Sequence, residues 1–178
     1  MPKKLKNSDY VDMLLFLSGL KRAVRLAYNS YEIYEEMEYW CQKFKYANQI
    51  SNSGLMYISK HIGLVKLVND FDDSVYPHAY ILGRLLGYPS CCSKQIANLG
   101  EDSIDKWENE LINSDGFKSE YSLINPVGYL SGNSLISHVP CSCKCKKPLK
   151  IAKSSLKIIK AYSDYECISR WRKWFDKF

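Results

Sequence analysis

A short stretch of the sequence, from Ser137 to Cys145, carries most of the residues that could do chemistry. It holds His138, Cys141, Cys143 and Cys145, and a second cluster, Cys91-Cys92, lies upstream. A thiolate is a soft ligand that suits zinc or an iron–sulfur cluster, and a neutral imidazole can join either centre. The two clusters therefore predict a bound metal or iron–sulfur centre.

The spacing of the cysteines indicates which of them act together. Cys141 and Cys145 are four positions apart and point the same way if a helix begins here, whereas Cys143 faces away. Together with Cys91 and Cys92 they supply four thiolates, enough for a [4Fe–4S] cluster or a tetrahedral zinc ion. Adjacent cysteines fit the separate corners of a cluster more easily than one zinc ion. This favours iron–sulfur, with zinc as the alternative.

His138 is expected to be a further metal ligand or a catalytic proton-transfer group beside the centre. Two interpretations without a metal remain open. The cysteines can be buried free thiols, or a redox pair can form between Cys141 and either Cys143 or Cys145. The sequence thus predicts an enzyme or enzyme component of unknown reaction, with a thiol redox protein as a further hypothesis.

A stripe of lysines follows the second cluster at helical spacing. It comprises Lys146, Lys150, Lys153, Lys157 and Lys160. Such a ridge can contact the phosphates of RNA, DNA or a nucleotide, although a solvated helix face is the simpler interpretation. The alternative function is therefore a structural-zinc module that binds RNA or another anionic partner. No glycine-rich phosphate loop or dinucleotide fingerprint accompanies the stripe.

Composition limits where such a site can work. The chain has 178 residues, 46% of them hydrophobic and 25% charged, and a formal net charge of +6. Five of the seven cysteines fall in the two clusters, a pattern typical of metal binding in a reducing compartment. No apolar run approaches the ~20 residues that cross a bilayer, and Asp9 and Asp12 interrupt the one segment that mimics a signal peptide. We expect a cytoplasmic protein without a membrane partner.

The elements that must position these residues follow from hydrophobic periodicity and turn signals. Helices are predicted at about 9–17, 30–46, 74–86, 93–99 and 102–112, after Cys145, and near the C-terminus. A further short segment at 21–28 precedes the 30–46 helix. Strands are predicted at 55–59, 64–68 and 134–137, with a hairpin turn at 61–63 and a polar turn at 48–54. Cys41 falls on the apolar face of the 30–46 helix and is expected in the core. The fold class is α+β: a basic flexible tail over 1–7, then one mostly helical domain over 8–178 with a small β-hairpin or sheet.

Two motifs carry a family resemblance. The stretch LGRLLGYPSCC, residues 82–92, resembles the "LGxLLGYPxCC" hallmark of the uncharacterised prokaryotic family called domain of unknown function 483. The stretch from Ser131 to Cys145 resembles its "SHxPCSxxC" motif. The resemblance implies that Cys91, Cys92, His138, Cys141 and Cys145 belong to one site, and it brings no reaction with it.

Overall fold

The structure is a computed structural model that describes Leu5 and residues 7–27, 30–74, 78–114, 123–125 and 134–161. Seven α-helices lie in these ranges: α1 (Asn7–Leu17), α2 (Tyr31–Phe44), α3 (Ile62–Asp72), α4 (Ala79–Leu85), α5 (Ser90–Leu99), α6 (Ile104–Ile112) and α8 (Lys146–Ala161). The strands are β1 (Ala23–Ala27), β2 (Ala47–Ile50) and β3 (Leu55–Ser59), and a 3₁₀ turn, η1 (Glu101–Ser103), precedes α6. The fold is α+β and mostly helical, as the sequence predicts. No helix within these ranges is long and apolar enough to cross a membrane.

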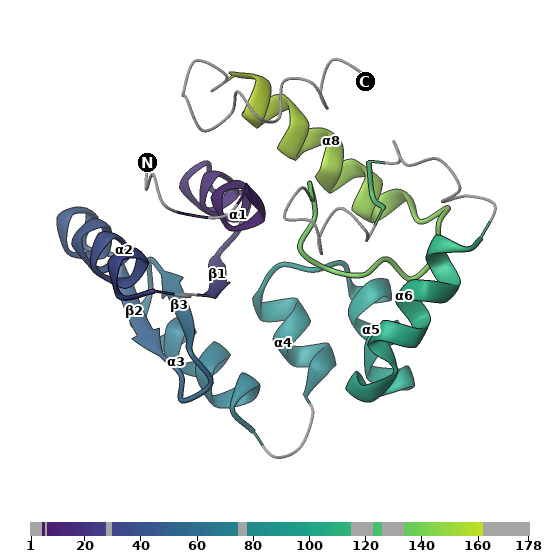
Figure 1. The fold of residues 1–178 in the computed structure, drawn as a ribbon, viewed down its shortest axis with the longest axis horizontal. Helices are drawn as coiled ribbons and strands as arrows, with labels where there is room; N and C mark the ends of the chain where they lie inside the picture. The colour runs from purple at the N-terminus through teal and green to yellow at the C-terminus, as the bar shows by residue number, and fades with distance from the viewer. Residues whose placement is uncertain are drawn as a thin grey trace.

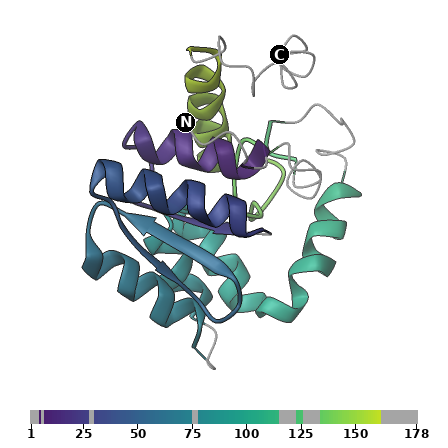
Figure 2. The ribbon, with the colours of Figure 1, turned by 60° about the vertical axis from the view of Figure 1, so that its left-hand side comes forward.

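The three strands form one antiparallel sheet in the order β1-β3-β2. Because successive side chains alternate between faces, Met56 and Ile58 face one side and Tyr57 faces the other. Helices α1 and α2 cover the first face, where Met37 and Cys41 complete a buried cluster. Helix α3 lies on the opposite face (Figure 2). The sheet therefore separates two apolar layers.

Helix α1 joins the sheet to the C-terminal half of the molecule. Met13 and Phe16 pack toward the sheet, while Tyr10, Leu14 and Leu15 pack with residues of α8 and of the 134–136 segment. A helix that is apolar on several sides is expected to be buried. Helix α8 lies beside α1, and the 134–145 segment runs between α8 and helices α4 to α6 (Figure 1).

The strand predicted at 64–68 is wrong, because these residues lie within helix α3. The apolar pairs Leu64-Val65 and Leu67-Val68 are compatible with both the two-residue period of a strand and the 3.6-residue period of a helix. In the helix Val65 and Val68, three positions apart, are buried, whereas Leu67 is exposed. The helix continues to Asp72 and is therefore longer than a short strand.

The hairpin lies one element earlier than predicted. Residues 47–50, part of which was predicted as a turn, form β2, and residues 51–54 connect it to β3. Gly54 takes a φ of 80°, the left-handed conformation that glycine adopts without strain. The Ser51 hydroxyl accepts a hydrogen bond from the Leu55 amide at 3.1 Å and so closes the turn. The piece at 21–28 contains β1, an edge strand of the same sheet.

Around the first cysteine cluster the helix boundaries differ from the prediction. The chain turns after α4 at Gly87, and α5 begins at Ser90 rather than Ser93. Cys91 and Cys92 therefore lie in the first turn of a helix. The strand predicted at 134–137 is also wrong. Ser134 hydrogen-bonds within the segment, donating to the Ile136 carbonyl and accepting from the Ile136 amide.

Helix α4 begins at Ala79, later than the predicted start at 74. The other predicted helices in the described ranges match in position to within a few residues, and Cys41 is 1% exposed, as expected of a core residue. Helix α1 begins at Asn7, inside the segment predicted as a tail. The helix predicted near the C-terminus and residues 1–4 lie outside the described residues.

Candidate metal centre

Four cysteine sulfurs from two distant segments converge at one point. The Sγ atoms of Cys91, Cys92, Cys141 and Cys145 all lie within 4.8 Å of one another. The Sγ atom of Cys91 is 3.9 Å from that of Cys92 and 3.7 Å from that of Cys145. Four thiols in this arrangement could hold a metal ion.

The first cysteine pair is positioned by the start of α5. Pro89 stands at the N-cap in extended backbone, with a φ of −58° and a ψ of 137°, so the chain enters the helix at a defined angle. Amide groups at a helix N-terminus stabilise nearby negative charge. Cys91 and Cys92 both stand in the first turn, close to these amide groups.

The second pair is positioned by the 134–145 segment. The Trp107 indole of α6 donates a hydrogen bond to the Pro140 carbonyl at 3.1 Å. The Lys21 ammonium donates to the Ser137 hydroxyl at 2.5 Å. Leu135 and Ile136 are buried in the cluster shared by α1 and α8. An irregular segment is thus held at several points along its length just before it delivers Cys141 and Cys145.

The thiols differ in their acidity. Burial raises the pKa of Cys141 to about 11, with hydrogen bonds to Cys145 and Cys91 adding to it. Burial likewise raises the pKa of Cys92. The pKa of Cys91 is lowered overall. Burial acts to raise this pKa, but the hydrogen bonds of Cys91 with Cys145, Cys141 and Cys92 have the larger, opposite effect. A metal that binds all four as thiolates must therefore displace protons.

His138 is not part of the four-sulfur group. Its ring stacks on that of Tyr88, with centroids 5.0 Å apart and planes at 27°. Burial, with a smaller contribution from Lys21, lowers the pKa of the imidazole to about 3, so the ring is neutral. Its Nε2 atom is buried and has no hydrogen-bond partner among the described residues. The predicted roles as ligand and as proton-transfer group stay predictions.

Cys143 also lies outside the group and packs against the apolar cluster between α1 and α8. Helix α8 begins only at Lys146, so Cys141 and Cys145 do not share a helix face as the spacing suggested, and the orientation expected of Cys143 stays a prediction.

The predicted lysine stripe lies on α8. Lys146, Lys150, Lys153 and Lys157 are all exposed, whereas Ala152, Ser155 and Ile159 on the same helix are buried. The charged side chains therefore form a continuous solvent face that begins directly after Cys145.

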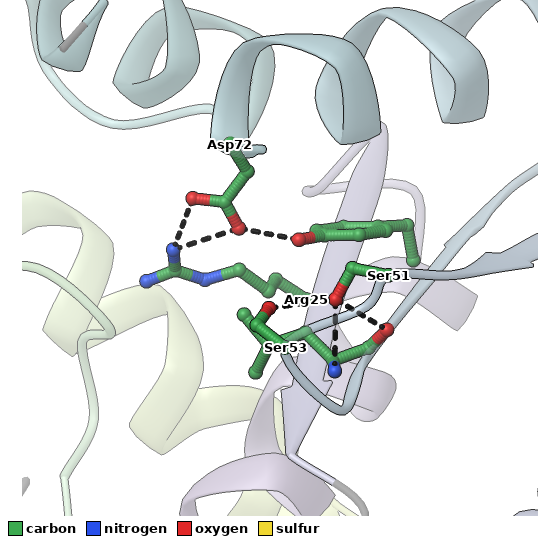
Figure 3. Close-up of polar contacts among 6 residues, drawn as sticks. Arg25, Ser51, Ser53 and Asp72 are labelled. Atoms are coloured by element: carbon green, nitrogen blue, oxygen red, sulfur yellow. Dashed lines mark hydrogen bonds and ion pairs between the residues drawn. The ribbon is translucent and has the colours of Figure 1, made fainter. Parts of the chain in front are cut away.

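A polar cluster that the sequence did not reveal lies across the sheet from α2. Arg25 on β1 donates from Nη1 to both oxygens of Asp72 on α3, at 2.8 and 3.1 Å. The Tyr57 hydroxyl donates to the same carboxylate at 2.5 Å. Figure 3 shows these contacts and the Ser51–Ser53 hydrogen bond of the neighbouring turn. Arg25 and Tyr57 are paired across β1 and β3, a register that no local pattern encodes.

A second group that the sequence analysis missed is Glu108. It stands on the apolar stripe of α6, between Ile104 and Leu111, and is only 7% exposed. A carboxylate at that position of the helical repeat was the signal that could have found it.

One known protein family matches most of the chain. The family model described as "Protein of unknown function (DUF483)" matches residues 43–175. The chain belongs to this family. The DUF483 match covers most of the chain, includes both cysteine clusters, and confirms the resemblance found in the sequence. No curated protein and no solved structure matches the chain.

Proposed function

We propose that this protein binds a single zinc ion through Cys91, Cys92, Cys141 and Cys145. The spacing of the sulfurs is the observation that carries the proposal. With Zn–S bonds of about 2.3 Å, the ligand sulfurs of a tetrahedral site lie about 3.8 Å apart. The distances of 3.9 and 3.7 Å from Cys91 to Cys92 and Cys145 agree with that value, and no pair of sulfurs in the group is more than 4.8 Å apart.

An iron–sulfur cluster fits the same spacing less well. Each cysteine of a [4Fe–4S] cluster binds a different iron at a corner, so the cysteine sulfurs stand roughly 6 Å apart. The four sulfurs would have to spread outward to accept such a cluster. The geometry thus supports zinc, the alternative in the sequence analysis, over the cluster.

The proposed role of the ion is structural. Four thiolates fill a tetrahedral shell and leave no open position for a substrate, the arrangement of structural zinc sites. The ion would fasten the first turn of α5 to the end of the 134–145 segment. This segment has little regular hydrogen bonding of its own, so a metal clamp would hold Ser137 and His138 in place.

Metal analysis tests the proposal. The protein is produced in medium that contains both zinc and iron, purified without oxygen, and assayed for zinc, iron and acid-labile sulfide. We expect about one zinc per chain, no sulfide and no visible colour. About four irons with matching sulfide and a brown colour would overturn it in favour of a cluster, and a protein without bound metal would overturn both.

We also propose an anionic partner, with RNA as the first candidate, for the exposed face of α8. The supporting observation is that Lys146, Lys150, Lys153 and Lys157 are all exposed on one helix. Phosphate contacts release counterions, so affinity should fall steeply with salt. Substituting Lys150, Lys153 and Lys157 by Gln should weaken binding of a single-stranded RNA and reduce its salt dependence. Binding that ignores salt would contradict this role.

A further inference from the structure

A cavity of about 270 Å³ lies next to the four cysteines, and Cys92 forms part of its wall. Apolar side chains come to it from helices α4, α5 and α6 and from the C-cap of α4: Leu82, Ile96, Ile104 and Leu86. Ser134, Ser137, His138 and Val139 line it from the 134–145 segment, and Arg25 and Asp72 line it from the sheet side. It is slightly smaller than the about 300–1,000 Å³ typical of ligand sites, which suits a small molecule.

Most polar groups on the wall are already satisfied within the protein. Arg25 and Asp72 form the ion pair described above. The hydroxyls of Ser93 and Ser134 donate to the carbonyls of Pro89 and Ile136, and Ser137 accepts from Lys21. These groups shape the cavity, but their principal hydrogen bonds are taken.

Among the charged groups of the described wall, Glu108 is the exception. Glu108 lines the cavity and is 7% exposed as a residue, and its carboxylate oxygens are not among the described polar atoms that are sealed from solvent without a partner. No hydrogen bond or ion pair joins its carboxylate to another of the described residues, so the carboxylate is free to accept from a ligand in the cavity. Burial, and to a lesser extent the charge of Asp105, raises the pKa of the carboxyl. Partial burial of a carboxylate that no group in the protein pairs disfavours its charged form. A group kept in this position is therefore a candidate for binding a ligand.

The charge of the wall indicates the class of ligand. Among the described residues, Arg25 and Asp72 on the wall form an ion pair, and Lys21 behind Ser137 is paired with Asp12. His138 is neutral, so Glu108 is the charged group of the described wall that has no opposite charge beside it. The surroundings of that charge are apolar. We infer that the cavity binds a small organic cation, a primary ammonium group on a short apolar chain, with the ammonium on Glu108.

His138 supports the same assignment. It lines the cavity, and in the part of the chain that the structure describes no group hydrogen-bonds to its Nε2 atom. A neutral imidazole can donate or accept one hydrogen bond there. A second polar group on the ligand would thus find a partner without adding charge to the site.

The inference is independent of which metal the cysteines hold, and a set of matched probes tests it. Pentylamine, pentanol and pentanoate have the same chain and differ in the head group. Each is titrated calorimetrically into the metal-loaded protein near neutral pH. We expect pentylammonium to bind, pentanol to bind at least about tenfold more weakly, and pentanoate not to bind.

Two variants on α6 make the test specific. Glu108→Gln keeps the shape of the side chain and removes its charge, and should weaken pentylammonium binding at least about tenfold. Glu110→Gln, at an exposed position of the same helix, should leave it unchanged. Circular dichroism verifies that both variants are folded. Absence of pentylammonium binding, equal binding of pentanol, or unchanged binding by Glu108→Gln would each overturn the inference.

Discussion

The sulfur atoms of Cys91 and Cys145 lie 3.7 Å apart although 54 positions separate the two cysteines in the chain. One stands in the first turn of α5 and the other directly precedes α8. Closing a loop of this length costs conformational entropy, which a metal ion bound at its ends can offset. The stability of the C-terminal half should therefore depend on this contact.

Substituting Cys145 should remove the metal and destabilise the fold. Cys145→Ser deletes one of the four thiolates, so we expect most of the zinc to be lost and the free energy of unfolding to fall by about 4 kcal/mol or more. Zinc content and urea denaturation measure the two effects. Cys143→Ser is the matched control, because Cys143 packs against the core outside the site and should keep its zinc. A full equivalent of zinc in Cys145→Ser would contradict the assignment.

Gly83 should be intolerant of even a methyl group. A Cβ built at this position would lie 2.5 Å from the Ser93 hydroxyl and 3.0 Å from its Cβ, so Gly83→Ala should push α4 and α5 apart. Overpacking of this kind costs about 1–3 kcal/mol. Gly63→Ala is the control, since nothing lies within 4 Å of its Cβ position in helix α3. That substitution should stabilise the protein by about 0.5–1 kcal/mol. Thermal unfolding distinguishes them, and equal effects would argue against close packing of α4 on α5.

The ion pair between Lys21 and Asp12 should behave as a coupled unit. Its charged atoms are 2.7 Å apart and both side chains are only 10% exposed. Lys21→Met leaves a buried carboxylate unpaired and should cost about 3 kcal/mol. Adding Asp12→Asn should recover part of that loss. Denaturant unfolding of the two single variants and the double variant measures the coupling, and strictly additive losses would show that the pair contributes little.

Glu108 should make stability depend on pH in a defined direction. Burial raises the pKa of its carboxyl in the folded state, so the folded protein holds the proton more tightly than the unfolded chain does. Its contribution is neutral below the ordinary carboxyl pKa of about 4.3 and becomes increasingly destabilising as pH rises through the folded-state pKa. Glu108→Gln should therefore gain stability over the wild type near neutral pH and lose that gain on acidification.

Melting temperatures of wild type and Glu108→Gln across this pH range measure the effect. Glu110→Gln provides the reference, because Glu110 is exposed. If the increase in melting temperature caused by Glu108→Gln is the same at every pH, the Glu108 carboxyl is not the titrating group.

The local pattern was a reliable guide where one helix face decides the structure. The spacing of Met37 and Cys41 predicted both the helix and the burial of Cys41. The same approach misassigned 64–68, because four apolar residues around one lysine fit a strand and a helix equally. It missed β2 because Ala47–Ile50 has turn-like polar residues and becomes a strand only by pairing with β3.

The sequence by itself determined the family, the α+β class and the set of thiols available for a metal. Soft ligands in tight clusters are a chemical signal that does not depend on the fold. Only the tertiary structure decided how closely the four sulfurs approach, and that spacing is the basis of the proposal of one zinc ion. It also set His138 apart from the sulfurs, against Tyr88, and placed Glu108 on the wall of a cavity. Distances between segments that lie 50 residues apart are the result of packing by the whole chain, and no local spacing contains them.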